Sequence, residues 1–255
     1  MRKLYLIGIG AGNPEYITFQ AIKALNAVDV FFFMDKGEAK HDLLKLRKEI
    51  CDRFIEKRSY RIVEAVDPVR DPSIADYTAR VEDWHRRRSL VYEETISREL
   101  GEDQSGAFLV WGDPSLYDST LRIIDQIGTR GNLCFDVEVI PGITSMQALA
   151  TRHKISLNGI GESIAITTGR QLSTHGSAIA ERTIVMLDGQ CSFNTLLDKD
   201  LDIYWGAYLG MEEEILLAGK LDEIAGRIEE IRGELRQKNG WIMDTYLVTG
   251  PVIGS

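Results

Sequence analysis

A carboxylate between two chain-breaking residues follows an apolar segment near the middle of the chain. Residues 107–111 form a short aromatic and aliphatic run, and Gly112-Asp113-Pro114 comes directly after it. We expect a buried strand that ends sharply here, because Gly accepts unusual backbone angles and Pro disfavours a helical residue before it. A carboxylate after the carboxyl end of a strand lies where open α/β sheets bind ligands. From these residues alone, a ligand contact and a simple turn are equally good interpretations.

Two further segments combine small residues with polar side chains. Residues 8–12, Gly-Ile-Gly-Ala-Gly, match the opening of a dinucleotide-binding turn, but Pro14 stands where the helix that holds the pyrophosphate should begin. This departure makes a nicotinamide-dinucleotide site a weak interpretation. Residues 141–145, Pro-Gly-Ile-Thr-Ser, follow another apolar run, and their hydroxyls suit either a helix cap or a contact to a polar ligand.

Other kinds of chemistry have little support in the pattern. The 4 histidines show no metal-ligand spacing, and the 3 cysteines have neither CxxC nor CxH spacing, so we expect no metal site and no disulfide framework. We interpret His153 as a structural residue rather than a proton shuttle. The serines lie in no G-x-S-x-G motif, which argues against an acyl-serine hydrolase.

Strands that alternate with amphipathic helices must position these turns. We expect strands at residues 4–9, 29–34, 62–66, 107–111 and 135–140, and helices from Thr18, at 40–57, at 73–100, from about Ser115 and at 146–152. This alternation predicts an α/β fold with a parallel sheet and helices on its faces.

The second half of the chain has a different pattern. It predicts strands at 164–168, 183–187, 203–205 and 241–248, and helical segments at 193–197, 212–218 and 221–237. We therefore expect two α/β domains, residues 1–140 and 141–255. The first would contain an inserted, highly charged helical region at about residues 36–103.

The net charge and the composition limit the kinds of partner and compartment that we expect for this protein. A net charge of -9 on 255 residues argues against a nucleic-acid partner held through phosphate contacts. The first apolar run is too short for a signal peptide or a membrane span, and the cysteine usage fits a reducing cytoplasm. The arginines of residues 53–88 are either a solvated helix face or a site for a polyanionic ligand.

Five blocks, taken together and in order, resemble the tetrapyrrole methylase family. They are residues 4–15, Gly112-Asp113-Pro114, and residues 139–145, 164–169 and 183–189. Residues 111–120 (WGDPSLYDST), 166–170 (ITTGR), 204–210 (YWGAYLG) and 240–247 (GWIMDTYL) further resemble the branch of this family that methylates precorrin-5 in aerobic cobalamin synthesis.

The resemblance implies fold, cofactor and reaction together. It implies two α/β domains with S-adenosylmethionine in the cleft between them, and a homodimer. A methyl group would pass to C1 of precorrin-5, the acetyl group on that carbon would leave as acetate, and precorrin-6A would result. S-adenosylhomocysteine would be the second product.

The resemblance also implies site residues. Those expected to contact the cofactor are Ala11, Trp111, Gly112, Asp113, Leu116, Thr144, Ser145, Leu187, Asp188, Leu209 and Gly210. Ala11 and Asn13 stand where many relatives have Pro and Asp, and Asp188 stands where many have Met. Loss of the acetyl group needs a base that activates water and donors that stabilise an oxyanion. The candidate catalytic residues are Tyr117, Asp118, Arg170, Asp188 and Asp244, with Asp118 or Asp188 as the base and Arg170 or Tyr117 as the donor.

Other functions remain open at this point. A relative that methylates another precorrin position, ribosomal RNA or a diphthine precursor shares the same blocks, although the acidic balance speaks against RNA. A dinucleotide-dependent oxidoreductase and a non-catalytic binding module are alternatives from other classes. Calorimetry against S-adenosylmethionine and NAD(P)H separates these possibilities.

Overall fold

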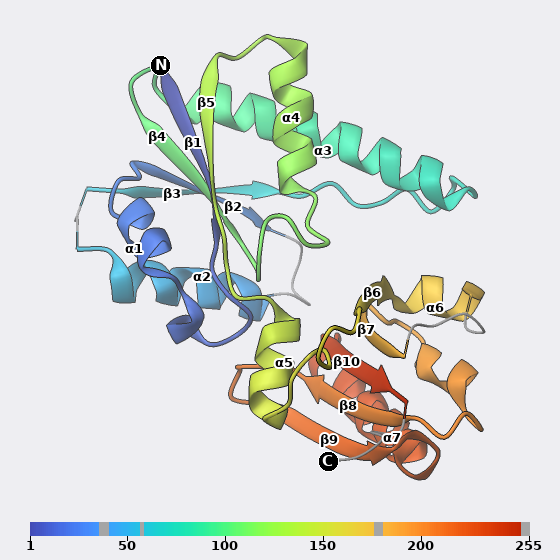
Figure 1. Cartoon of the computed structure of the whole chain (residues 1–255). Helices are drawn as coiled ribbons and strands as arrows, with labels where there is room; N and C mark the ends of the chain where they lie inside the picture. The colour runs from blue at the N-terminus through green and yellow to red at the C-terminus, as the bar shows by residue number, and fades with distance from the viewer. Residues whose placement is uncertain (36–40, 57–58, 176–180, 251–255) are drawn as a thin grey trace. The chain divides into compact units, whose positions relative to one another are not determined.

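Two separate β-sheets organise the chain (Figure 1), and each belongs to its own structural unit. The computed structural model describes residues 1–35, 41–56, 59–175 and 181–250. The first unit comprises Met1–Gly10 and Pro14–Thr144, and the second comprises Ala11–Asn13 and Ser145–Ser255. The sequence placed the boundary after residue 140 and did not anticipate that Ala11–Asn13 groups with the second unit. Part of the expected inserted region lies outside the described residues, namely residues 36–40 and 57–58. These include both limits, 40 and 57, that were expected for its first helix.

The first unit contains the parallel sheet that the sequence predicted. Its five strands are β1 (Arg2–Gly8), β2 (Val30–Asp35), β3 (Arg61–Val66), β4 (Ser105–Val110) and β5 (Phe135–Ile140), in the order β3-β2-β4-β1-β5. All the pairings are parallel. The loops that follow β1, β4 and β5 therefore leave the sheet at the same edge, its carboxyl edge.

Helices cover both faces of this sheet (Figure 1). One face packs against α1 (Phe19–Leu25) and α2 (His41–Phe54), and the other packs against α3 (Tyr77–Glu99) and α4 (Thr120–Arg130). Thr18 caps α1 by accepting a hydrogen bond from Ala21 N at 3.1 Å, as expected from its position. A short 3-10 turn, η1 (Pro14–Tyr16), follows the glycine-rich segment in place of a long helix. The dinucleotide interpretation therefore has no helix start beside its glycines.

The prediction of a helix from Ser115 is wrong, because α4 begins only at Thr120. Asp113 accepts a hydrogen bond from Ser115 N, which forms a local turn, and Tyr117 has a φ of 51°. Asp118 then accepts a bond from Thr120 N at 2.7 Å. These side-chain contacts hold the segment in turns and delay the helix.

The sheet of the second unit is mixed. Its five strands are β6 (Ala165–Thr168), β7 (Arg182–Met186), β8 (Asp202–Ala207), β9 (Ile215–Lys220) and β10 (Asp244–Thr249), in the order β6-β7-β10-β8-β9. Only β6 and β7 pair in parallel, and the other pairings are antiparallel. The helical elements of this unit are α5 (Ser145–His153), α6 (Gly169–His175), η3 (Ser192–Leu196) and α7 (Leu221–Asn239).

One expectation for this unit is wrong, and one helix was missed. Residues 212–218 were expected to be helical, but β9 pairs in antiparallel register with β8 over Ile215–Lys220. The run Ile215-Leu216-Leu217 fits a strand edge as well as a helix, and tertiary pairing decides between them. Helix α6 was not anticipated, because the glycine at its start, Gly169, was interpreted as the end of a strand.

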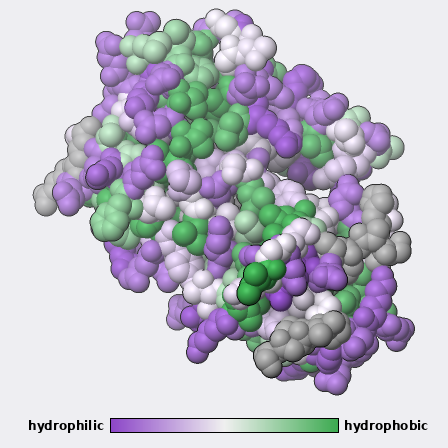
Figure 2. Space-filling view, in the orientation of Figure 1, coloured by the Kyte–Doolittle hydropathy of each residue, from purple (hydrophilic) through white to green (hydrophobic). Residues whose placement is uncertain are grey.

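Two further observations concern hydrophobic residues. Figure 2 shows hydrophobic side chains gathered over β5, where Val137 and Val139 are 37% and 40% exposed. Within the described part of the chain, none of the helices combines the length and the apolar character needed to cross a membrane.

Candidate functional site

Backbones of the first unit approach closely at the carboxyl edge of its sheet. Gly112 N donates to Gly10 O at 2.9 Å, and Gly10 N donates back to Gly112 O at 3.3 Å. A Cβ added to Gly142 would lie only 2.1 Å from Gly112 O, and one added to Gly8 would lie 2.6 Å from Gly142 N. The loops after β1, β4 and β5 therefore require glycine at these positions, and they bring main-chain polar groups together without intervening side chains.

Asp113 lies at this meeting point in a fixed orientation. Its Oδ2 accepts from Gly142 N at 2.8 Å, and its Oδ1 accepts from both Ser115 N and the Ser115 hydroxyl. Burial opposes ionisation of this carboxyl, but the hydrogen bonds from Ser115 and Gly142 outweigh burial and lower its pKa below the ordinary value. A carboxylate has about four acceptor positions, so Oδ2 can still accept one further donor.

Three of the other first-unit residues expected at the cofactor lie within three positions of Asp113 in the chain, and the fourth, Thr144, follows β5. Gly112 and Thr144 are buried, while Trp111 and Leu116 are half-buried. A Cβ on Gly112 would lie 3.8 Å from Thr144 Cα, so these two segments are neighbours. The structure thus brings the first-unit candidates together around the glycine loops.

Tyr117 and Asp118 lie in the same loop but differ in environment. Tyr117 is 45% exposed, and partial burial raises the pKa of its phenol. Asp118 is half-buried and lines a cavity of about 30 Å³, which is large enough for one water molecule. Arg47, Arg88 and Thr120 line the same cavity. The single hydrogen bond from Thr120 N leaves most of the acceptor positions of Asp118 available.

The second-unit candidates form two groups. One group is Ala11, Leu209 and Gly210: Ala11 is buried, and a Cβ on Gly12 would lie 2.1 Å from Leu209 O. This contact explains why residues 11–13 pack with the second unit. Ser145, the first residue of α5, accepts a hydrogen bond from the Thr245 hydroxyl at 2.9 Å.

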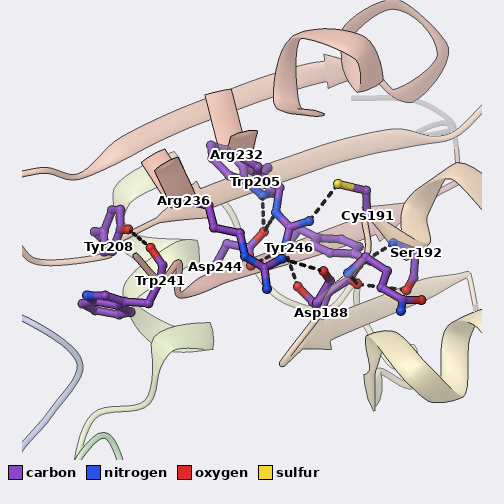
Figure 3. A network of polar contacts seen from close by, with 12 residues as sticks. Asp188, Cys191, Ser192, Trp205, Tyr208, Arg232, Arg236, Trp241, Asp244 and Tyr246 are labelled. Carbon is purple, nitrogen blue, oxygen red and sulfur yellow. Dashed lines mark hydrogen bonds and ion pairs between the residues drawn. The ribbon is translucent and has the colours of Figure 1, made fainter. Parts of the chain in front are cut away.

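The second group centres on Asp188, which is 5% exposed (Figure 3). Its Oδ1 accepts from Gln190 N and the Ser192 hydroxyl, both at 2.9 Å. Its Oδ2 accepts from Ser192 N at 2.6 Å and from the Tyr246 hydroxyl at 2.7 Å. Four donors from its own unit fill the acceptor positions of this carboxylate. The arrangement favours a structural role for Asp188 over that of a base, while the neighbouring Leu187 is 62% exposed.

Asp244 is buried in the same network and is paired with a residue that the sequence analysis missed. Arg232 Nε lies 2.8 Å from Asp244 Oδ2, and Trp205 Nε1 donates to the same oxygen at 2.8 Å. Burial raises the pKa of Asp244, although the Arg232 charge opposes this shift. Arg232 also donates to Asp188 O. The signal was available, because Arg232 lies four residues after Ile228 on the apolar stripe of α7.

The remaining candidates are less constrained. Arg170 is exposed at the start of α6, next to Gly169, where an added Cβ would lie 2.5 Å from Asp188 Cγ. The motifs that contain Arg170 and Asp188 therefore lie together, at the ends of the parallel strands β6 and β7. His153 Nε2 lies 3.0 Å from Trp205 O, which agrees with the structural role predicted for it. No cluster of potential metal ligands occurs among the described residues.

Comparison with known proteins yields several matches. Residues 3–225 match the model of the family described as Tetrapyrrole (Corrin/Porphyrin) Methylases. The chain is 48% identical to precorrin-6A synthase [deacetylating] from Sinorhizobium sp. over 248 residues, which cover 97% of this chain and 95% of that protein. A crystal structure of a cobalamin synthesis related protein, CobF, from Corynebacterium diphtheriae superposes with a TM-score of 0.84 at 40% identity and covers 98% of both chains. Uroporphyrin-III C-methyltransferase from Thermus thermophilus, solved with S-adenosylhomocysteine, shares the fold with a TM-score of 0.59 at 15% identity, over 97% of both chains.

Proposed function

The chain belongs to the tetrapyrrole methylase family, and we propose that it is the S-adenosylmethionine-dependent enzyme that methylates C1 of precorrin-5 and releases acetate to form precorrin-6A. The observation that carries this proposal is the 48% identity, over 97% of the chain, to a precorrin-6A synthase of the deacetylating type.

The residues of the glycine loops fit the proposed cofactor. S-adenosylmethionine supplies an activated methyl group on a sulfonium. Gly112 and Gly142 approach each other so closely that a side chain on Gly142 would collide with the backbone, which leaves main-chain donors and acceptors as the binding groups. Asp113, ionised and held by Ser115 and Gly142, retains an acceptor position for a hydroxyl or ammonium group.

We infer from the family resemblance which residues contact the cofactor. From the first unit these are Trp111, Gly112, Asp113, Leu116 and Thr144, and from the second they are Ala11, Ser145, Leu187, Leu209 and Gly210. The protein's main task in methyl transfer is to align donor and acceptor and to exclude water, because the sulfonium needs no covalent activation. A site built from glycine loops and small hydroxyls suits this task.

We propose that Asp118 is the base for acetate release. It faces a water-sized cavity, and Arg47 and Tyr92 lie on the wall of the same cavity. A carboxylate with open acceptor positions beside such a cavity can hold a water molecule and take a proton from it as the water oxygen adds to the ketone carbonyl. Collapse of this adduct would then break the bond between the acetyl carbon and C1, so that acetate leaves and the electron pair stays on the macrocycle. Tyr117, in the same loop, is the candidate donor to the oxyanion, and Arg170 is the alternative donor. We assign Asp188 and Asp244 a structural role, because their hydrogen bonds stabilise the second unit.

The experiment is incubation with precorrin-5 and isotopically labelled S-adenosylmethionine, followed by mass analysis and an acetate assay. We expect labelled precorrin-6A, S-adenosylhomocysteine and acetate in equal amounts. Asp118→Asn should still transfer the methyl group but should release little acetate, because the amide cannot accept the proton. Asp125→Asn, an exposed change on α4, is the matched control. Methylation at another position of the macrocycle, or acetate release by Asp118→Asn at the wild-type rate, would contradict the assignment.

We further infer a cytoplasmic homodimer that binds neither nucleic acid nor membranes. The family resemblance supports the dimer, and the exposed valines of β5 offer an apolar surface for it. The three cysteines of the described residues are free thiols, which supports a reducing compartment. Light scattering after gel filtration measures the oligomeric state, and a monomer at micromolar concentration would contradict the dimer.

A further inference from the structure

Three arginines of the first unit gather around Trp84 and His85. Arg70 follows β3, Arg88 lies on α3, and Arg122 lies in the first turn of α4. The guanidinium carbons of Arg70 and Arg88 lie 4.4 Å and 4.5 Å from the centre of the Trp84 ring. Partial burial lowers the pKa of His85, and the charges of Arg88, Arg122 and Arg70 lower it further, although the Asp118 carboxylate opposes this shift. Guanidinium groups from three different elements thus act on one imidazole.

Only one of these arginines is neutralised within the protein. Arg88 is buried and forms an ion pair with Asp67 at 2.6 Å, and its remaining nitrogens donate to Ser119 and Tyr92. Arg70 and Arg122 are exposed, and neither forms an ion pair or hydrogen bond with any residue in the described ranges. In a chain of net charge -9, Arg70 and Arg122 therefore add two positive groups without an ion-pair partner among the described residues, and Asp118 is the carboxylate whose charge also acts on His85.

Local stability does not account for Arg122. A cation in the first turn of a helix opposes the helix dipole, which favours negative charge at that end. A charge that the helix itself disfavours is best explained by an anion from outside the protein.

The position of the cluster indicates which ligand it meets. It lies at the carboxyl ends of β3 and β4, the sheet edge that also carries Asp113 and Asp118. The strand order is β3-β2-β4-β1-β5, and the glycine loops of the proposed cofactor site follow β4, β1 and β5, whereas Arg70 follows β3 at the opposite end of the strand order. The cluster is therefore placed for the second substrate rather than for the cofactor.

We propose that Arg70, His85 and Arg122 form a subsite that binds a carboxylate side chain of the tetrapyrrole substrate. This inference rests on the proposed function, because the macrocycle's acetate and propionate groups supply the anion. Guanidinium forks bind carboxylates in bidentate geometry, and neutral His85 adds one N–H donor. Arg88, fixed by Asp67, holds Trp84 in place and positions the subsite without contacting the ligand itself.

The test uses uroporphyrin III, a stable porphyrin with eight carboxylates, and follows the quenching of tryptophan fluorescence. The variants are Arg70→Gln, Arg122→Gln and the pair together. Each single change should weaken binding about two- to fivefold, since an exposed charge pair contributes up to about 1 kcal/mol, and the double variant should also show a shallower salt dependence. Arg227→Gln, which removes an exposed charge of α7 that is paired with Glu230, should bind like the wild type.

Two results would overturn the subsite. One is an unchanged affinity in the double variant, or no binding to the wild-type chain. The other is an equal loss in Arg227→Gln, because a uniform charge effect would then explain the data. S-adenosylmethionine affinity, measured by calorimetry, should be the same in all variants, and with precorrin-5 the KM should rise while kcat changes little. If the wild type does not methylate precorrin-5, the proposed function fails, while the porphyrin titration still decides the subsite.

Discussion

Replacing Asp188 tests whether this carboxylate holds the second unit together or takes part in catalysis. The side chain accepts four hydrogen bonds, and its partners Ser192 and Tyr246 are themselves buried, whereas Gln190 is exposed. In Asp188→Ala, three donors stay buried without an acceptor: the N–H and hydroxyl of Ser192 and the hydroxyl of Tyr246. In Asp188→Asn, an NH2 group replaces one of the two carboxylate oxygens. This NH2 group then faces N–H or O–H donors and cannot accept their hydrogen bonds.

The expected cost follows from these donors. An unsatisfied buried donor costs about 1–3 kcal/mol, so the three buried donors left in Asp188→Ala should together cost about 3–9 kcal/mol of unfolding free energy. Asp188→Asn should lose about 2 kcal/mol, because one oxygen remains. Tyr246→Phe removes a donor and leaves the carboxylate three others, so it should cost about 1 kcal/mol.

Urea unfolding followed by circular dichroism measures these free energies, with Asp125→Asn as the control that should stay within about 0.5 kcal/mol of the wild type. S-adenosylmethionine calorimetry on the folded fraction provides the functional readout. An Asp188→Ala chain with the wild-type urea midpoint would refute the structural argument. So would an Asp188→Asn chain of wild-type stability that has lost acetate release, since Asp188 would then act in the chemistry.

Four further predictions concern single sites. Gly142→Ala should weaken S-adenosylmethionine binding at least about tenfold in calorimetry, because its Cβ would lie 2.1 Å from a backbone oxygen and displace the loop. Gly233→Ala, in the open middle of α7, should instead raise the unfolding free energy by about 0.5–1 kcal/mol, measured in urea. Arg88→Met should cost about 3–5 kcal/mol by the same measurement because it leaves Asp67 buried without its partner, and Asp67→Asn in addition should restore part of the loss. Hydrogen bonds lower the pKa of Asp113, so its ionised form stabilises the fold above the ordinary Asp pKa of 3.8, and this stabilisation is lost as pH falls through the lowered pKa. The urea midpoints of wild type and Asp113→Asn should therefore differ by a constant amount near neutral pH and converge as pH falls below 3.8.

Much of the first unit was predictable from local pattern. Its strands are short apolar runs, its helices carry one apolar face, and Thr18 caps α1 as its residue type indicates. The parallel arrangement follows, since each strand is joined to the next by a segment long enough for a crossover. The second unit was less predictable, because 212–218 has no period that separates helix from strand, and only pairing with β8 makes 215–220 a strand.

By itself, the sequence determined the family, the glycine loops and the set of polar residues near them. The tertiary structure alone decided which of those residues are available. Asp113, Asp118 and Asp188 all follow a strand. Hydrogen-bond donors occupy the acceptor positions of Asp188, and one of them is Tyr246, which lies 58 positions away in the chain. Asp118 instead faces a cavity. Hydrogen-bond partners distant in sequence set the free acceptor capacity of a carboxylate, and no local pattern encodes them. For the same reason, only the fold brought Arg70, His85 and Arg122 to one edge of the sheet.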